Sequence, residues 1–294
     1  MIRRALGSDH LAGWMFVLPA VVLIGVFGIL PIGWALVLSF QQNDLLTTPT
    51  WVGLDNYRAL VHDQVFRDSI RRTLVYTVLF VPLSVGGAMG VALLLHRPIR
   101  FSRFYRTAVF VPVATSTVAT GIIFNWLLDP TYGIANFLLG KVGLGPYGFF
   151  QDPDQALYAI VLMTVWGWLG FDVIIYLAAL QGIPEDLMEA AQLDGAGRWA
   201  TFRHVVWPLL SPATLFLIVW STINALQVFD EIYVTTRGGP LHATTVLVYY
   251  LYSQAFELFH AGYAAAVAEV LFLITLVFSV VQLWLGNRRV HYSS

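Results

Sequence analysis

The chain of 294 residues has no cysteine and few charged residues. Without cysteine, disulfides, thiolate metal ligands and cysteine nucleophiles are excluded. Charged residues make up 11% of the chain, whereas soluble domains carry about 25%. This deficit leaves too little polar surface to coat a soluble globule, so the chain is expected to be solvated largely by membrane lipid.

Several kinds of site are also missing from the sequence. The seven histidines are scattered and show no metal-ligand spacing. Gly140-Lys141-Val142 lacks the upstream glycine and the hydroxyl of a phosphate-binding loop. The net charge is -1, and without a basic arm we expect no nucleic-acid partner. We therefore predict a non-catalytic chain that binds no metal and carries no cofactor of its own.

Long apolar runs fill most of the sequence, which is 58% hydrophobic. A helix needs about 20 apolar residues to cross the hydrocarbon of a bilayer. Six runs meet this length, which predicts an all-α membrane protein with a single transmembrane domain over residues 1–294. The predicted spans are 11–40, 73–95, 105–128, 156–180, 209–234 and 262–285. The first run follows two arginines but lacks a cleavage site, so we interpret it as a retained span.

The distribution of basic residues predicts the orientation of these spans, because cytoplasmic loops carry an excess of Lys and Arg. The loop at 96–106 holds four arginines and no acid. Both termini, this loop and the loop at 181–208 are therefore expected in the cytoplasm. Segments 41–72, 129–155 and 235–261 are expected outside, and residues 244–259 are predicted to form a surface or re-entrant helix.

The polar loop at 184–208, which leads to Pro208 and Pro212, is unusually well ordered for a connection between spans. Pro184 and the acids that follow favour the start of a helix. Gly195 and Gly197 favour a sharp turn. Trp199 and Phe202 belong to the apolar face of a second helix. This helix–turn–helix predicts a docking surface, and a simple hairpin that links two spans is the alternative.

The residues of this loop resemble the EAA loop of permease subunits in bacterial ABC importers. Glu189-Ala190-Ala191, Asp194-Gly195-Ala196, Phe202 and the Pro208–Pro212 pair carry the resemblance. Further matching segments are 52–57, Arg106-Thr107 with Pro112, 129–133 with Asn136, 229–236, Gly238-Gly239-Pro240 and 262–266. The chain is most similar to the carbohydrate branch, of the maltose or glycerol-3-phosphate type. It departs at Arg237, where Gly is common, and at Arg72, where Asn is frequent.

The resemblance also implies the other subunits of the transporter. It implies a second, related permease, two copies of a cytoplasmic ATPase that bind ATP and Mg, and an extracytoplasmic solute-binding protein or lipoprotein. It places the chain in the bacterial inner membrane, surrounded by lipid. It also implies that the loop transmits ATP hydrolysis through Glu189, Ala190, Ala191, Asp194, Gly195, Ala196 and Gly197. A permease for glycerol 3-phosphate or a polyamine is an alternative. A secondary transporter is another, although we find no internal repeat.

Polar side chains inside the spans indicate a path for the solute, because such groups are costly in lipid. In the fifth span, four residues recur at helical spacing and are predicted to share one face: Trp220, Asn224, Gln227 and Glu231. Trp168 and Asp172 in the fourth span and Glu269 in the sixth are further candidates. Amides beside an aromatic ring suit a sugar. The alternative for each residue is a hydrogen bond between helices or to the partner permease.

Overall fold

The computed structural model describes residues 2–98 and 100–287, and these residues are nearly all helical. The predicted all-α class is confirmed. The chain divides into two compact units, one formed by Met1–His62 with Leu251–Val270 and the other by Asp63–Tyr250 with Leu271–Ser294. The single domain over residues 1–294 stays a prediction.

Among the described residues, four helices are long and apolar enough to cross a membrane: Gly13–Ser39, Gln64–His96, Ala156–Gln181 and Ala261–Gly286. Two further helix pairs meet this test together but are sharply bent. The bend is 101° between Ser102–Ala114 and Thr117–Leu127, and 63° between Arg198–Leu209 and Ser211–Leu226. The number of spans is therefore between four and six. The predicted span 105–128 contains the first of these bends, and the predicted span 209–234 begins at the second.

The first unit begins with an almost continuous helix. It comprises α1 (Ile2–Ile24), the π-helical turn η1 (Gly25–Ile29) and α2 (Leu30–Ser39). A short antiparallel pair follows, β1 (Gln41–Gln42) with β2 (Thr50–Trp51), and then α3 (Asp55–His62). The π-helical turn η5 (Ser253–Glu257) precedes α15 (Ala261–Asn287).

Gly262, in the first turn of α15, lies against the β1 segment. Its N–H donates to the Asn43 carbonyl at 3.2 Å. A Cβ at this position would collide with the Gln41 carbonyl oxygen. Only glycine therefore lets the start of this helix lie directly on the backbone after the first span.

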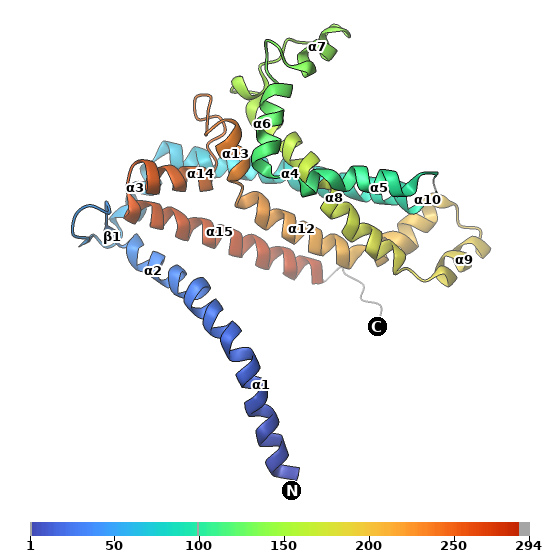
Figure 1. The fold of residues 1–294 in the computed structure, drawn as a ribbon, viewed down its shortest axis with the longest axis horizontal. Helices are drawn as coiled ribbons and strands as arrows, with labels where there is room; N and C mark the ends of the chain where they lie inside the picture. Colours follow the sequence, from blue (N-terminus) through green and yellow to red (C-terminus); the bar gives the residue numbers. More distant parts are fainter. Residues whose placement is uncertain (1, 99, 288–294) are drawn as a thin grey trace. The chain divides into compact units, whose positions relative to one another are not determined.

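The second unit is built on the contact between α4 (Gln64–His96) and α8 (Ala156–Gln181). These helices lie side by side in Figure 1, and α12 (Ser211–Leu226) packs against α4. The Ser84 hydroxyl donates to the Asp172 carboxylate across the α4–α8 contact at 2.6 Å. A buried cluster surrounds this bond, and it includes Ala88, Ala92, Tyr176, Leu210 and Leu217.

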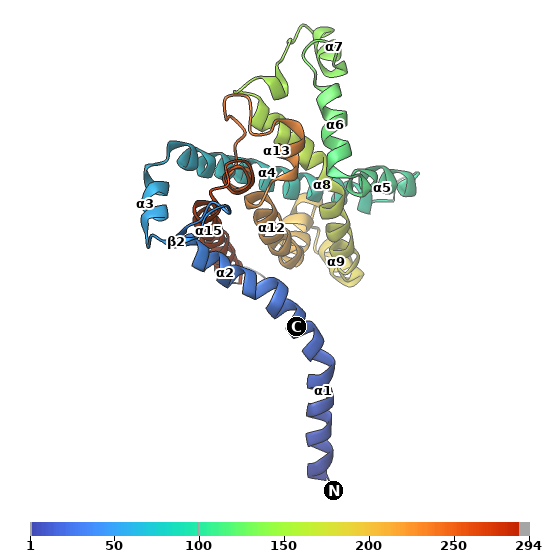
Figure 2. The ribbon, with the colours of Figure 1, turned by 60° about the vertical axis from the view of Figure 1, so that its left-hand side comes forward.

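A glycine of α8 lets the bent third segment approach this helix closely. The segment consists of α5 (Ser102–Phe110), η2 (Val111–Ala114) and α6 (Thr117–Leu127). At Gly170 of α8, a Cβ would collide with the Val109 carbonyl oxygen and lie 2.9 Å from Val113. Beyond α6, the short helix α7 (Ile134–Gly140) extends away from the α4–α8 pair in both views (Figures 1 and 2). The 3-10 turn η3 (Phe149–Gln151) then leads into α8.

A structured turn joins α13 (Asp230–Thr235) to α14 (Leu247–Tyr252). The Leu247 N–H donates to the Thr73 hydroxyl at 2.8 Å, and the Tyr250 hydroxyl hydrogen-bonds the Asp63 carboxylate. These bonds hold α14 to the start of α4. The helix predicted within 244–259 is confirmed, as α14 followed by η5.

Candidate functional sites

The loop at 184–208 folds as two short helical segments joined by a turn. The first is α9 (Glu185–Leu193), and the second comprises α10 (Arg198–Thr201), the π-helical η4 (Phe202–Val206) and α11 (Trp207–Leu209). Gly195 has φ +76°. The Ala196 N–H donates back to the Ala191 carbonyl at 2.9 Å, and the Asp194 N–H donates to Ala190 at 3.0 Å. Glycine in the left-handed conformation closes a helix in this way, so the predicted helix, break and helix are confirmed.

One side of this loop is anchored and the other is exposed. Met188 and Phe202 pack against the buried cluster of the second unit. The seven residues predicted to transmit ATP hydrolysis lie on α9 and the turn. Five are exposed and two half-buried: Glu189, Ala190, Asp194, Gly195 and Gly197 are exposed, and Ala191 and Ala196 are half-buried. Beside them, Leu193 and Trp199 are 89% and 74% exposed. An anchored loop that exposes large apolar groups next to small residues can dock into a groove.

A second candidate site lies at the break between α12 and α13. The helix α12 ends at Leu226, and α13 starts at Asp230. Asp230 and Glu231 occupy the first turn of α13, where acidic side chains favour a helix start. Gly121 of α6 allows α13 to approach closely, since a Cβ there would lie 2.7 Å from Val234. The break therefore presents polar groups beside α6 and α8.

Two small cavities meet at this break, with volumes of about 90 and 150 Å³. They share a wall made of Thr117, Thr164, Trp168 and Glu231. The larger cavity is also lined by Tyr76, Phe80, Asn224, Gln227 and Asp230, among others. The smaller one adds Pro112, Thr115, Thr120 and Met163. Residues of α4, η2, α6, α8, α12 and α13 thus contribute to one polar and aromatic site.

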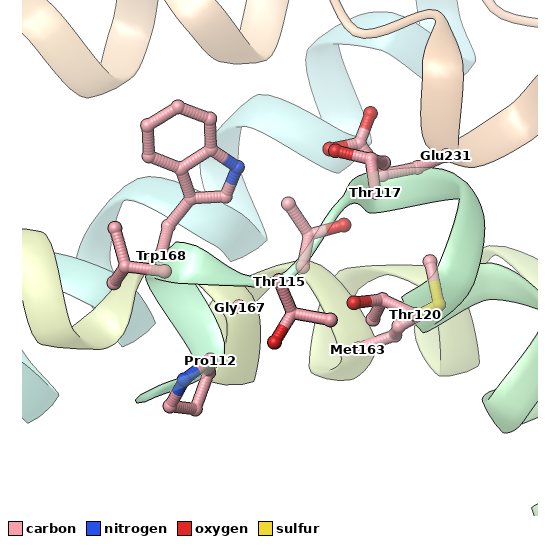
Figure 3. Close-up of a pocket in the computed structure, with 10 residues that line it drawn as sticks. Pro112, Thr115, Thr117, Thr120, Met163, Gly167, Trp168 and Glu231 are labelled. Carbon is pink, nitrogen blue, oxygen red and sulfur yellow. The ribbon is translucent and has the colours of Figure 1, made fainter. Parts of the chain in front are cut away.

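Trp168 and Glu231 both line the shared wall. Figure 3 shows the indole nitrogen on the side of the ring that faces Glu231. Asn224 donates its side-chain N–H to the Trp220 carbonyl at 2.8 Å. The site thus combines an indole ring, two carboxylates, two amides and several hydroxyls, which can hydrogen-bond and stack on a polyhydroxylated solute.

Only some of the residues predicted to line the solute path come together in the structure. Asn224, Gln227 and Glu231 meet at the larger cavity. The expectation that they share one continuous helical face with Trp220 is wrong, because α12 ends before Gln227. Trp220 does not line either cavity and instead stacks on Phe216, with ring centroids 6.3 Å apart.

The remaining intramembrane acids lie outside this site. Asp172 is buried and accepts the hydrogen bond from Ser84 described above, so it joins two helices. Glu269 lies half-buried on α15, in the first unit. Thr117 and Thr164, which line both cavities, had not been expected. Each is a single hydroxyl on an apolar helix, and only the tertiary packing brings the two together.

Arg237 and Arg72, the two residues that depart from the family's usual sequence, each occupy a distinctive position in the structure. Arg237, where Gly is expected, has φ +48°, a backbone conformation that glycine adopts most easily. Its guanidinium lies 5.8 Å from the centre of the Tyr233 ring. Arg72 lines a separate cavity at the N-terminal end of α4.

The sequence of this chain matches a known protein family. The model of the family described as "Binding-protein-dependent transport system inner membrane component" matches residues 81–291. The chain belongs to this family. It is 36% identical to the lactose transport system permease protein LacF of Rhizobium radiobacter, over 94% of each chain. It is 33% identical to the sn-glycerol-3-phosphate transport system permease protein UgpA of Yersinia enterocolitica, over 95% of each chain.

A solved structure shows the same fold. A chain of a bacterial ABC transporter involved in the import of the acidic polysaccharide alginate superposes with a TM-score of 0.86, at 24% identity and over 98% of both chains. The resemblance to ABC importer permeases is thus confirmed. As a member of this family, the chain is a multi-pass inner membrane component of a transport system that depends on a binding protein.

Proposed function

We propose that the chain is the permease subunit of an ABC importer that moves a neutral sugar into the cell. In this proposal a second, related permease completes the transmembrane path. Two copies of a cytoplasmic ATPase bind ATP and Mg and drive transport through the loop at 184–208. An extracytoplasmic binding protein delivers the sugar, and both termini lie in the cytoplasm.

The observation that carries the choice of solute is the site at the break between α12 and α13. Trp168 offers an aromatic face, and Asn224 and Gln227 offer amides. A sugar presents C–H groups to the first and hydroxyls to the second. Among the described residues that line the two cavities, none is Lys or Arg, whereas Asp230 and Glu231 are acidic. This charge favours an uncharged sugar over glycerol 3-phosphate.

The loop supports the proposed coupling. Its α9 and turn expose small residues on a segment that is packed firmly against the bundle. Force applied to the exposed turn would therefore reach the ends of α8 and α12 rather than being absorbed by a flexible linker. A secondary transporter would have no use for such a docking segment.

Asn224→Ala tests the site. Removing this amide leaves a hydroxyl of the bound sugar without its partner, so we expect uptake to fall about tenfold, the effect of losing one hydrogen bond of about 1.5 kcal/mol. The assay is initial uptake of labelled sugars by cells that express the complete importer at equal levels. Competing sugars and glycerol 3-phosphate in excess identify the solute class.

Asn125→Ala is the matched control. Asn125 on α6 makes the same kind of bond within its own helix, to the Gly121 carbonyl at 3.0 Å, and does not line either cavity. Its replacement should leave uptake unchanged. Equal uptake by both variants and the wild type would mean that the break is only structural. Uptake that persists without ATP while an ion gradient remains would favour secondary transport.

A further inference from the structure

A third cavity lies at the N-terminal ends of α4 and α8, away from the break. It measures about 360 Å³ and is open to the surface. Its charged lining residues are Asp68, Arg71, Arg72 and Asp154. Val75, Leu157 and Tyr158 form the apolar part of the wall, and Leu241 and Ala243 come from the turn before α14. The cavity belongs entirely to the second unit.

The arginine at position 72 is incompletely satisfied. Its Nη1 atom is buried and has no hydrogen-bond partner. Within the described part of the chain, none of the four charged side chains of this cavity forms an ion pair. A buried polar atom without a partner is uncommon in native proteins, and this guanidinium can still donate a hydrogen bond to an acceptor. A guanidinium pairs best with a carboxylate or a phosphate, through parallel N–H bonds.

The surface next to the cavity is apolar and uncovered. The helices α4 and α8 run in the same direction, because Arg72 lies near Leu157 at one end and Ser84 bonds Asp172 further along. Beyond the cavity, the side chain of Val78 on α4 is 69% exposed and that of Leu162 on α8 is 63% exposed. Val78 follows Arg71 and Val75 at helical spacing, and Leu162 follows Tyr158. A membrane protein that exposes such a strip offers it to acyl chains.

From these features we infer that the cavity binds the headgroup of a zwitterionic phospholipid with a primary ammonium group, phosphatidylethanolamine. Arg71 and Arg72 hold the phosphate, and Asp68 and Asp154 accept the ammonium N–H groups. The acyl chains then lie along Val78 and Leu162. Two cations and two anions give the cavity no net charge, which fits a zwitterion better than an anionic lipid.

The test is lipid titration of the purified, delipidated importer in detergent, read by native mass spectrometry. Phosphatidylethanolamine should bind more tightly than phosphatidylcholine, which has no ammonium N–H, and phosphatidylglycerol, which has no cation. Arg72→Gln should weaken phosphatidylethanolamine binding at least about tenfold, the effect of one charge-assisted hydrogen bond. Arg67→Gln is the control, because Arg67 lies exposed on the same helix and donates to Gln64 at 2.6 Å.

A second variant separates loss of the lipid from loss of the fold. Asp154→Asn should reduce the preference for phosphatidylethanolamine over phosphatidylglycerol while leaving binding to the phosphate intact. Equal binding of the three lipids, or wild-type binding by Arg72→Gln, would overturn the inference. The inference would also be overturned if Arg72→Gln, assayed without lipid, only raised the KM for the binding protein. An acidic side chain of that protein would then be the ligand of Arg72.

Discussion

Trp199 in the exposed loop is the side chain whose removal should most weaken assembly with the ATPase. It is 74% exposed, and Phe202 covers part of one side with ring centroids 5.6 Å apart. Leu193, on the other side of the turn, is 89% exposed. A large aromatic group that is held in place yet uncovered is typical of the residues that dominate protein–protein binding energy.

The size of the effect follows from the area that Trp199 can bury. An aromatic side chain buries about 150–250 Å², and about three quarters of that remains available here. At about 25 cal/mol per Å², full burial would contribute about 4 kcal/mol. Because alanine keeps part of the contact and the rim of an interface stays wet, we expect Trp199→Ala to weaken binding by about 2 kcal/mol, or about thirtyfold.

The assay is titration of the ATPase subunit onto the permease pair in lipid nanodiscs. Trp126→Ala is the control, because Trp126 on α6 is 68% exposed but lies outside the loop. Its replacement should leave the Kd for the ATPase unchanged. If Trp199→Ala and Trp126→Ala bind the ATPase as tightly as the wild type, the exposed face of the loop is not the docking surface.

Three further predictions concern stability, measured by unfolding of the purified permease in detergent. A double-mutant cycle of Ser84→Ala and Asp172→Ala should give a coupling energy of about 0.6–2 kcal/mol; a value near zero would mean that their hydrogen bond does not join α4 to α8. Gly170→Ala should destabilise by about 1–3 kcal/mol, because the added methyl collides with the third segment. Gly167→Ala should not, because its Cβ would meet open space. Arg237→Val should lower stability by about 1–2 kcal/mol, since β-branched residues resist positive φ, whereas Arg237→Gly should be tolerated.

Apolar length alone predicted the straight helices well. The runs expected at 73–95 and 156–180 fall within α4 and α8, and the run at 262–285 falls within α15. A long stretch without charges has few alternatives in lipid, because every backbone N–H and C=O must be paired within the helix. The predicted span began at residue 73, whereas α4 begins at Gln64, because residues 64–72 are too rich in charged side chains to extend an apolar run.

The bends and the solute site could not be predicted in the same way. Pro112 and Pro212 marked the neighbourhood of two bends, but a proline does not give the angle. The break after Leu226 had one signal, the paired acids Asp230 and Glu231 that favour a new helix start. The shared wall of the cavities combines hydroxyls from different helices, and their meeting depends on tertiary packing that periodicity does not report.

The local conformation of the loop at 184–208 was predictable because each signal is short-range. Proline and acids start α9, and Gly195 ends it in the left-handed conformation. The exposure of Leu193 was not predicted, because apolar residues in a short amphipathic helix are ordinarily expected to face the bundle.

Simultaneous measurement of ATP hydrolysis and sugar uptake in proteoliposomes tests the central claim most directly. The complete importer should take up sugar only while ATP is hydrolysed. Glu189→Ala and Gly195→Val should lower uptake per ATP hydrolysed while the permease stays in the membrane in normal amounts. Unchanged uptake per ATP in both variants, or uptake without ATP, would contradict the claim that this loop couples hydrolysis to transport.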